Sequence, residues 1–290
     1  MTNVLTLISN IKEAAISSEV KDKYVKLLNA TSSNWLSNNV ALDLFFEGDL
    51  DENIKLSLKK EMFDHAVQKT ATRRKKLLLA DMDSTIIQCE CIDELADFMG
   101  IKNKVSHITE SAMRGEIDFK AALKERVALL KGLKMKDLDT VFKERVALTP
   151  GAKTLVLTMN ANGANTVLVS GGFTYFTERV SELTGFRVNR ANILLHKNGE
   201  LTGQVGEPIV DSNTKINSLI EFRSNANLSI HDTIAVGDGA NDIPMLLGAG
   251  LGVGYNPFPT AGEAADVILN HGDLTALLYI QGYTDKEFIT

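Results

Sequence analysis

The chain has few cysteines and no long apolar segment. Cys89 and Cys91 are its only cysteines, and cysteines at this spacing rarely form a structural disulfide, so we expect a reducing compartment. Because no further soft ligands lie near them, a metal site or redox pair at these cysteines is not expected. No apolar run approaches the roughly 18 residues that a membrane span needs, and the N-terminus lacks a basic segment followed by an apolar signal core. We therefore expect a cytoplasmic protein that does not bind membranes.

Positive charge is also scarce. The 290 residues include 31 lysines and arginines against 37 aspartates and glutamates, which gives a net charge of −6 and a pI near 5.5. This balance argues against a nucleic-acid-binding surface, so any anionic ligand must be held by local basic residues. With 44% hydrophobic residues, the chain is long enough for one large globular domain and a smaller one.

Two acidic residues follow a short apolar run near residue 80. The run Leu77–Ala80, preceded by the basic cluster Arg73–Lys76, predicts a buried parallel strand. Asp81 and Asp83 come next, and residues two apart on an extended chain point to the same side. Paired carboxylates at a strand end suit a metal ion, or one nucleophile with one general acid. A polar turn that caps the following helix is the simpler alternative.

Two further strand-like runs also end in polar residues. Thr166–Val169 leads into Ser170–Phe173, where a hydroxyl and glycine N–H groups predict an anion-binding turn before a helix. Thr233–Val236 leads into Gly237–Asp242, an acidic, glycine-rich turn. Between these two segments, Lys215 lies where a helical pattern begins. Three strands are thus predicted to deliver polar groups to one edge of a sheet.

These segments, in this order, resemble the motifs of the haloacid dehalogenase superfamily of phosphatases, and within it the phosphoserine phosphatases. The matching residues are Asp81–Thr85, Ser170–Phe173, Lys215 and Gly237–Asp242. The resemblance implies an α/β fold, with a Rossmannoid parallel sheet that has helices on both faces and a helical cap inserted after the first core strand. It also implies hydrolysis of O-phospho-L-serine to L-serine and phosphate, the last step of serine biosynthesis.

The resemblance assigns catalytic roles to several of these residues. It implies that Asp81 attacks phosphorus to form an aspartyl-phosphate, while Asp83 protonates the departing serine oxygen and later activates water. Lys215, the Ser170 hydroxyl and the Gly171 N–H would hold the phosphate oxygens and stabilise the charge of the transition state.

The resemblance also implies a metal cofactor. Asp81, a backbone carbonyl at Asp83, and Asp238 would bind Mg²⁺, because oxygen ligands without histidine or cysteine favour Mg²⁺ over Zn²⁺. Asn241 and Asp242 would orient the metal and its waters, and Asn241 is also expected to contact the substrate.

Residues from about 90 to 148 have the apolar spacing of successive amphipathic helices, which matches the expected cap. By resemblance, Glu90 pairs with the substrate ammonium and Arg126 grips its carboxylate. Without the resemblance, each would be interpreted as a solvated surface charge. Met113 and Phe119 are similar to cap residues that shield the substrate, although core packing explains them almost as well.

We expect three structural units. These are a small N-terminal α+β domain (1–72), a catalytic core (73–89 and 149–290) and the cap (90–148). In the N-terminal unit the pattern predicts a strand at 4–8, a helix at 11–29, a half-exposed strand at 40–46, a helix at 51–60 and a polar connector at 68–76, in a βαβαβ-like order. Similar proteins often carry a ligand-binding or oligomerisation domain here. No ligand motif is visible in this one, so a structural or dimer-forming role is the simpler expectation.

Three alternatives remain open from the sequence. The substrate could be another small phosphomonoester, or phosphoryl could pass between amino alcohols. A catalytically silent effector-binding protein is a second alternative, although the complete set of Asp81, Asp83, Lys215 and Asp238 argues against it. A dehalogenase fits least, because that reaction needs no leaving-group protonation. The sequence leaves open the oligomeric state, any effector or feedback by serine, and the preference between L- and D-phosphoserine.

Overall fold

A six-stranded sheet forms the centre of the protein, for which a computed structural model describes residues 2–290. Its strand order is β12-β11-β10-β5-β6-β7, and every neighbouring pair is parallel. The strands are β5 (Leu77–Ala80), β6 (Asn165–Phe173), β7 (Val188–Asn192), β10 (Thr233–Gly237), β11 (Gly252–Tyr255) and β12 (Val267–Leu269). The predicted strand that carries the two aspartates, β5, therefore lies in the interior of the sheet.

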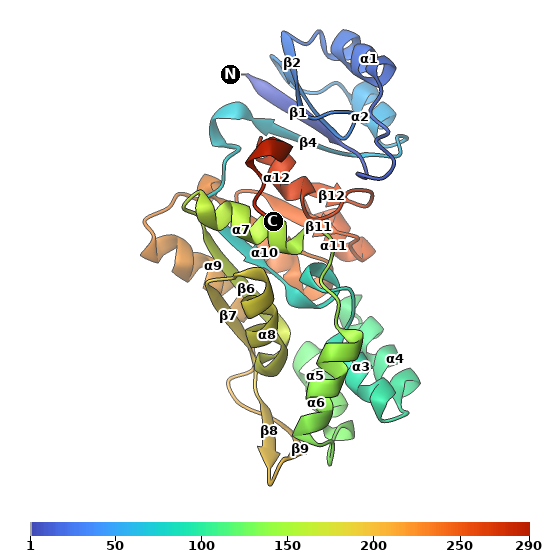
Figure 1. Cartoon of the computed structure of the whole chain (residues 1–290), viewed down its shortest axis with the longest axis vertical. Helices are drawn as coiled ribbons and strands as arrows, with labels where there is room; N and C mark the ends of the chain where they lie inside the picture. Colours follow the sequence, from blue (N-terminus) through green and yellow to red (C-terminus); the bar gives the residue numbers. More distant parts are fainter. Residues whose placement is uncertain (1) are drawn as a thin grey trace.

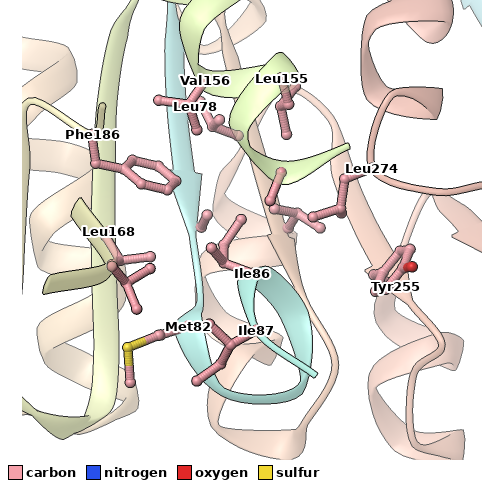
Figure 2. Packing of buried hydrophobic residues seen from close by; sticks show 14 of the residues in the cluster. Leu78, Met82, Ile86, Ile87, Leu155, Val156, Leu168, Phe186, Tyr255 and Leu274 are labelled. Carbon is pink, nitrogen blue, oxygen red and sulfur yellow. The ribbon is translucent and has the colours of Figure 1, made fainter. Parts of the chain in front are cut away.

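Helices cover both faces of this sheet. They are α7 (Ala152–Ala161), α8 (Thr174–Thr184), α9 (Ser212–Asn225), α10 (Ile243–Gly248), α11 (Pro259–Ala264) and α12 (Ala276–Ile280). Leu77 and Leu79 pack in one cluster with residues of α9 and α10, whereas Leu78 and Ala80 pack with residues of α7, α8 and α12. Figure 2 shows the second cluster, with Leu78 beside Val156 of α7. The parallel sheet with helices on both faces confirms the expected fold class. Because β5 is buried on both faces, it needs apolar residues at every position, and this is the pattern that predicted it.

Four helices lie between β5 and α7 along the chain. They are α3 (Cys91–Phe98), α4 (Lys102–Met113), α5 (Phe119–Leu129) and α6 (Met135–Arg145). The chain leaves β5 through a tight turn, and an isolated bridge between Ile87 and Leu148 brings the returning segment beside the exit. The four helices are therefore an insertion, the expected cap, which Figure 1 shows as a separate layer beyond the core. None of the helices described for residues 2–290 is long and apolar enough to cross a bilayer.

A hairpin of the core contacts this cap. Its strands β8 (Leu194–Lys197) and β9 (Glu200–Val205) join through an Asn198–Gly199 turn, where both residues have positive φ. The Gly132 N–H donates to the Leu201 carbonyl (2.9 Å), and the Leu201 N–H donates to the Leu133 carbonyl (2.8 Å). These bonds attach the hairpin to the loop between α5 and α6, so part of the cap is held directly by the core.

The N-terminal segment forms a second, antiparallel sheet with the order β2-β3-β1-β4. Its elements are β1 (Asn3–Ile8), α1 (Ser18–Leu28), β2 (Ser32–Ser37), β3 (Ala41–Phe46), α2 (Glu52–Leu58) and β4 (Asp64–Lys69). The observed βαββαβ order shows that the expected βαβαβ order was wrong, because the sequence pattern missed β2. It also assigned no residues to the last strand, β4. Both are edge strands with polar sequences and lack the alternating apolar residues that predict a strand.

Strand β3 is buried on both faces, so the expected half-exposed strand was also wrong. Leu42 and Leu44 pack against α1 and α2, and Ala41 joins the cluster of the catalytic core. Asp43, on the same face as Ala41, is 1% exposed and forms an ion pair with Arg73 (2.7 Å). The second face is covered because this sheet packs beside α12 and β12 of the core, as Figure 1 shows.

Two boundaries in this region also differ from expectation. The helix expected from residue 11 begins at Ser18, because the Ser17 hydroxyl accepts a backbone N–H of the first turn (3.3 Å) and caps it there. The segment 68–76 is not a free polar connector. Its first two residues end β4, and Lys75 is only 5% exposed, with its Nζ donating to two backbone carbonyls.

Candidate active site

The carboxyl end of β5 presents Asp81 and Asp83 to one enclosed space. The Asp81 N–H donates to the Val236 carbonyl (3.0 Å), which continues the contact of β5 with β10 past the last paired residue. The backbone then turns at Ser84, where φ is 54°. Asp83 accepts a hydrogen bond from the N–H of Cys91 at the start of α3 (2.8 Å). Both aspartates are nearly buried and line the same pocket.

Lys215 lies between Asp81 and Asp242 and is fully buried. Its Nζ is 2.8 Å from Asp81 Oδ1 and donates to Asp242 Oδ1 at 2.6 Å. The side chain comes from the first turn of α9, where Asp211 caps the helix by accepting the N–H of Thr214 (2.9 Å). Burial opposes the charged ammonium, but the charges of Asp242 and Asp81 outweigh it and raise the pKa of Lys215. Lys215 is therefore a permanent cation in the site.

The turn after β10 places Asp238 and Asp242 beside Asp81. Asp242 Oδ2 accepts the N–H groups of Asp238 (3.1 Å) and Gly239 (3.2 Å). A side chain at Gly237 is excluded, because its Cβ would lie 2.3 Å from the carboxyl carbon of Asp242. Both carboxylate oxygens of Asp242 are thus used within the protein, whereas Asp238 accepts the Thr85 hydroxyl at Oδ1 (3.1 Å).

The carboxylates of Asp81, Asp238 and Asp242 form a buried cluster that fits a divalent cation. One oxygen from each lies within 4.8 Å of the others. Burial, followed by the charge of Asp242, raises the pKa of Asp81 to about 8 and that of Asp238 well above its ordinary value. Within residues 2–290, Lys215 is the cation that pairs with this cluster, so a bound cation would compensate for the remaining negative charge. Asp81 and Asp238 are the better direct ligands, because Asp242 already holds Lys215 and two N–H groups.

The segment around Ser170 continues β6 and does not form the expected turn. Strand β6 runs to Phe173 and shifts its register against β7. The Ser170 hydroxyl donates to Asp83 Oδ2 (3.1 Å) and accepts the Gly172 N–H (2.8 Å). A Cβ at Gly172 would lie 2.6 Å from Asp83 Oδ2, and one at Gly171 would lie 2.6 Å from the ring of Phe119. The glycines therefore let Asp83 and the cap approach the strand, whatever role their N–H groups play.

Glu90 and Arg126 reach the same pocket from the cap. Glu90 accepts the Ser84 hydroxyl (2.7 Å), and burial, followed by the charge of Asp83, raises the pKa of Glu90 to about 8. Arg126 is 2% exposed. Its Nε donates to the Ala122 carbonyl (3.2 Å) and its Nη1 to a threonine hydroxyl, and no carboxylate of residues 2–290 forms an ion pair with it. Burial lowers the pKa of Arg126, although the charge of Glu90 opposes the shift.

Residues of the core and the cap together line this pocket, which has an accessible volume of about 20 Å³. The residues singled out in the sequence that line it include Asp81, Asp83, Glu90, Met113, Phe119, Arg126, Gly171 and Asn241. Phe119 covers Gly171, and Met113 covers Gly239, where a Cβ would lie 2.7 Å from its sulfur. The Oδ1 atom of Asn241 is buried and has no hydrogen-bond partner in the described part of the chain, residues 2–290. An unpaired buried acceptor of this kind is costly, and a bound ligand with donor groups would satisfy it.

Three further predicted residues contact the pocket residues without lining it. Lys215 holds Asp81, Ser170 holds Asp83, and Asp238 lies within the carboxylate cluster. Sequence reasoning gave no role to three others, Thr85, Asp93 and Thr109. The Thr85 hydroxyl donates to Asp238, and the Thr109 hydroxyl accepts from Arg126 and donates to Asp93. The only available signal for the last two was a polar residue on the apolar face of a helix, where it needs a buried partner.

Comparisons with known proteins agree with this geometry. The sequence matches the family described as haloacid dehalogenase-like hydrolase over residues 78–247. It is 46% identical over 208 residues to the phosphoserine phosphatase of Polaromonas sp. (strain JS666), which covers 70% of this chain and 88% of that protein. It is 33% identical over 283 residues to the phosphoserine phosphatase of Saccharomyces cerevisiae. This alignment covers 94% of this chain and 91% of that protein.

A solved structure gives the same relationship. The structure described as a phospho-aspartyl intermediate analogue of phosphoserine phosphatase superposes with a TM-score of 0.68 at 36% sequence identity, covering 71% of this chain and 98% of the other. A phospho-aspartyl group is the covalent intermediate that an aspartate nucleophile forms. Most of the catalytic part of the chain is thus similar to that protein in both sequence and structure. The chain therefore belongs to the haloacid dehalogenase-like hydrolase family of enzymes.

Proposed function

We propose that the protein hydrolyses O-phospho-L-serine to L-serine and phosphate through an aspartyl-phosphate on Asp81. The observation that carries the proposal is Arg126, a buried guanidinium without an acidic partner in residues 2–290, in the same small pocket as Asp81 and Asp83. A buried cation without a counter-charge is costly, and a ligand carboxylate would compensate for it. The curated relatives named phosphoserine phosphatase support this substrate.

The first half-reaction uses Asp81 and Asp83. A carboxylate oxygen of Asp81 attacks phosphorus, and the bond between phosphorus and the serine oxygen breaks. Asp83 gives its proton to that oxygen. Burial raises the pKa of Asp83, so its protonated form is accessible for this step. The products are L-serine and phosphorylated Asp81.

The second half-reaction returns the enzyme to its starting state. Asp83, now a carboxylate, takes a proton from water, whose oxygen attacks the phosphorus of the aspartyl-phosphate. The bond between phosphorus and Asp81 breaks, phosphate leaves, and Asp83 is again protonated. Closure by Met113 and Phe119 would exclude other water from the pocket during this sequence.

Charge on the phosphate must be balanced in the pocket. Lys215, already bound to Asp81, and the Gly171 N–H would stabilise the non-reacting oxygens. A divalent cation fits the carboxylate cluster, and we assign it as Mg²⁺, held by Asp81, Asp238 and a backbone carbonyl at Asp83, because all these ligands are oxygens. When bound, Mg²⁺ would offset the charge of the phosphate and orient it.

Glu90 and Arg126 would select the amino-acid part of the substrate. Arg126 presents a guanidinium to the serine carboxylate, and Glu90 offers a carboxylate to the serine ammonium. A sugar phosphate carries neither group and would leave both charges unpaired in the pocket. This cost disfavours the alternative of a general small phosphomonoester.

We extend the proposal to the whole chain. Residues 1–72 would form a structural or dimer-forming unit, 73–89 with 149–290 the catalytic core, and 90–148 the cap. The cytoplasm is the proposed site of action, since both cysteines are free and the substrate is a small metabolite.

Replacing Arg126 with alanine tests the substrate assignment. We expect kcat/KM for O-phospho-L-serine to fall by about 100-fold or more, because a buried charge-assisted contact to the carboxylate is lost. Hydrolysis of an aryl phosphate, which has no carboxylate, should change by no more than about 3-fold, within the effect of an indirect contact. Steady-state phosphate release from both substrates provides the measurement.

Arg145→Ala is the matched control, because Arg145 is a cap arginine that pairs with Glu94 and Asp97 outside the pocket. It should leave both activities unchanged. If the native protein hydrolysed the aryl phosphate but ignored phosphoserine, the hydrolase chemistry would stand and the proposed substrate would be wrong.

Removing divalent metal tests the cofactor assignment. Dialysis against a chelator should abolish phosphate release, and added Mg²⁺ should restore it, whereas Ca²⁺, which is larger and takes more ligands, should restore little. Asp238→Asn should raise the Mg²⁺ concentration needed for half-maximal activity, because it removes one charged ligand. Full activity after exhaustive chelation would contradict a metal-dependent site.

A further inference from the structure

Arg126 is held in place by a chain of hydrogen bonds across three cap helices. Its Nη1 donates to the Thr109 hydroxyl at 3.0 Å, and that hydroxyl donates to Asp93 Oδ1 at 2.7 Å. Asp93 lies on α3, Thr109 on α4 and Arg126 on α5. All three side chains are at most 9% exposed. A threonine hydroxyl has one proton and two lone pairs, so it can accept from the arginine and donate to the carboxylate at once.

This arrangement leaves part of the guanidinium free. The Nε atom is held by the Ala122 carbonyl (3.2 Å) and Nη1 by Thr109, whereas Nη2 has no hydrogen-bond partner in residues 2–290. In a direct pair between Arg126 and Asp93, the two parallel N–H donors of the guanidinium, which form its fork, would both bind the aspartate. They would then not be free for a ligand. With Thr109 between them, the aspartate anchors the arginine and leaves Nη2 free, and Arg126 lines the pocket.

We propose that Thr109 and Asp93 are positioning residues for substrate specificity, which hold the Arg126 fork open toward the substrate carboxylate. The inference rests on the proposed function, since it concerns how that substrate is recognised. Neither residue touches the reacting atoms. Their effect is confined to substrates that carry a carboxylate, because the chemistry at Asp81 does not depend on the orientation of Arg126.

Thr109→Val keeps the shape of the side chain and removes the hydroxyl. We expect its kcat/KM for O-phospho-L-serine to fall by about 10- to 100-fold, mostly through KM, since the arginine would lose its fixed orientation. O-phosphoethanolamine has the ammonium and the phosphate but no carboxylate, so its kcat/KM should change little. The ratio of kcat/KM for the two substrates should therefore drop toward the ratio measured for Arg126→Ala.

Three comparisons separate positioning from a general loss of structure. Thr109→Ser restores the hydroxyl and should recover most of the ratio. Thr140→Val removes a hydroxyl from cap helix α6 that contacts only the backbone of its own helix (3.5 Å), and it should leave the ratio unchanged. Asp93→Asn keeps an acceptor for Thr109 but removes its charge, so the ratio should fall between those of the wild type and Thr109→Val.

Two outcomes would overturn the inference. Equal losses for phosphoserine and phosphoethanolamine in Thr109→Val, without rescue by serine, would mean that Thr109 only supports the cap. An unchanged ratio in a folded Thr109→Val protein would mean that Arg126 orients itself. A wild-type protein that did not prefer phosphoserine to phosphoethanolamine would instead refute the proposed function, and this result is visible before any variant is made.

Discussion

Asp81→Asn is expected to abolish phosphate release from both phosphoserine and an aryl phosphate, with a loss of at least about 10⁴-fold. The substitution keeps the size of the side chain and removes its nucleophilic carboxylate. Burial already raises the pKa of Asp81, so removing its charge should not unfold the protein. Single-turnover assays with acid quench and mass spectrometry should find a phosphoryl group on Asp81 in the native protein and none in the variant.

Two further variants test whether the loss of activity is specific to Asp81. Asp49→Asn changes an exposed aspartate of the N-terminal unit and should retain full activity. Asp83→Asn should lose more activity toward phosphoserine than toward an aryl phosphate. A phenolate can leave without a proton, whereas the serine oxygen must be protonated as it leaves. Asp81→Asn that kept a few per cent of native activity would show that another residue attacks phosphorus.

Lys215→Met is expected to lower the free energy of unfolding by about 3 kcal/mol or more and to abolish activity. Lys215 is 0% exposed and pairs with Asp81 and Asp242 at 2.8 and 2.6 Å. Without it, two buried carboxylates face each other with no cation, and one of them must take up a proton or remain unpaired. Urea unfolding of the metal-free protein, followed by circular dichroism, measures the change.

The matched control is Lys76→Met. Its Nζ lies 3.0 Å from Asp232, but the side chain is 63% exposed, and exposed pairs contribute at most about 1 kcal/mol. The double variant Lys215→Met with Asp242→Asn should recover part of the lost stability, because it removes one of the two unpaired charges. A Lys215→Met protein as stable as the native one would mean that the carboxylates are satisfied without the lysine.

The residues of the catalytic site could be located from sequence because each follows an apolar strand. Asp81 and Asp238 directly follow β5 and β10, and Ser170 follows the apolar run within β6. Parallel strands bring their carboxyl ends to one edge of the sheet. Lys215 could be placed at a helix start by the capping residue Asp211 before it. These signals come from residues that are neighbours in the chain, so they can be recognised without knowledge of the fold.

Elsewhere the local signals failed for identifiable reasons. Strands β2 and β4 have polar sequences because each is an edge strand, and neighbouring strands rather than their own residues hold them in place. The burial of Asp43 could not be expected, because its partner Arg73 lies 30 residues away and joins it only after the two sheets pack. The segment after Ser170 was expected to turn, yet it continues β6 because two glycines permit close contact with Asp83 and Phe119.

Three strands of the core, the acids and the lysine near their ends, and the helices of the cap could be expected from the sequence alone. These follow from periodicity and from residues adjacent in the chain. Which groups are buried together depends on how the whole chain packs. Among residues 2–290, no acidic side chain pairs with Arg126, and Thr109 separates it from Asp93. Charge and hydrogen-bond partners in a pocket come from several helices at once, and no single segment encodes their distances.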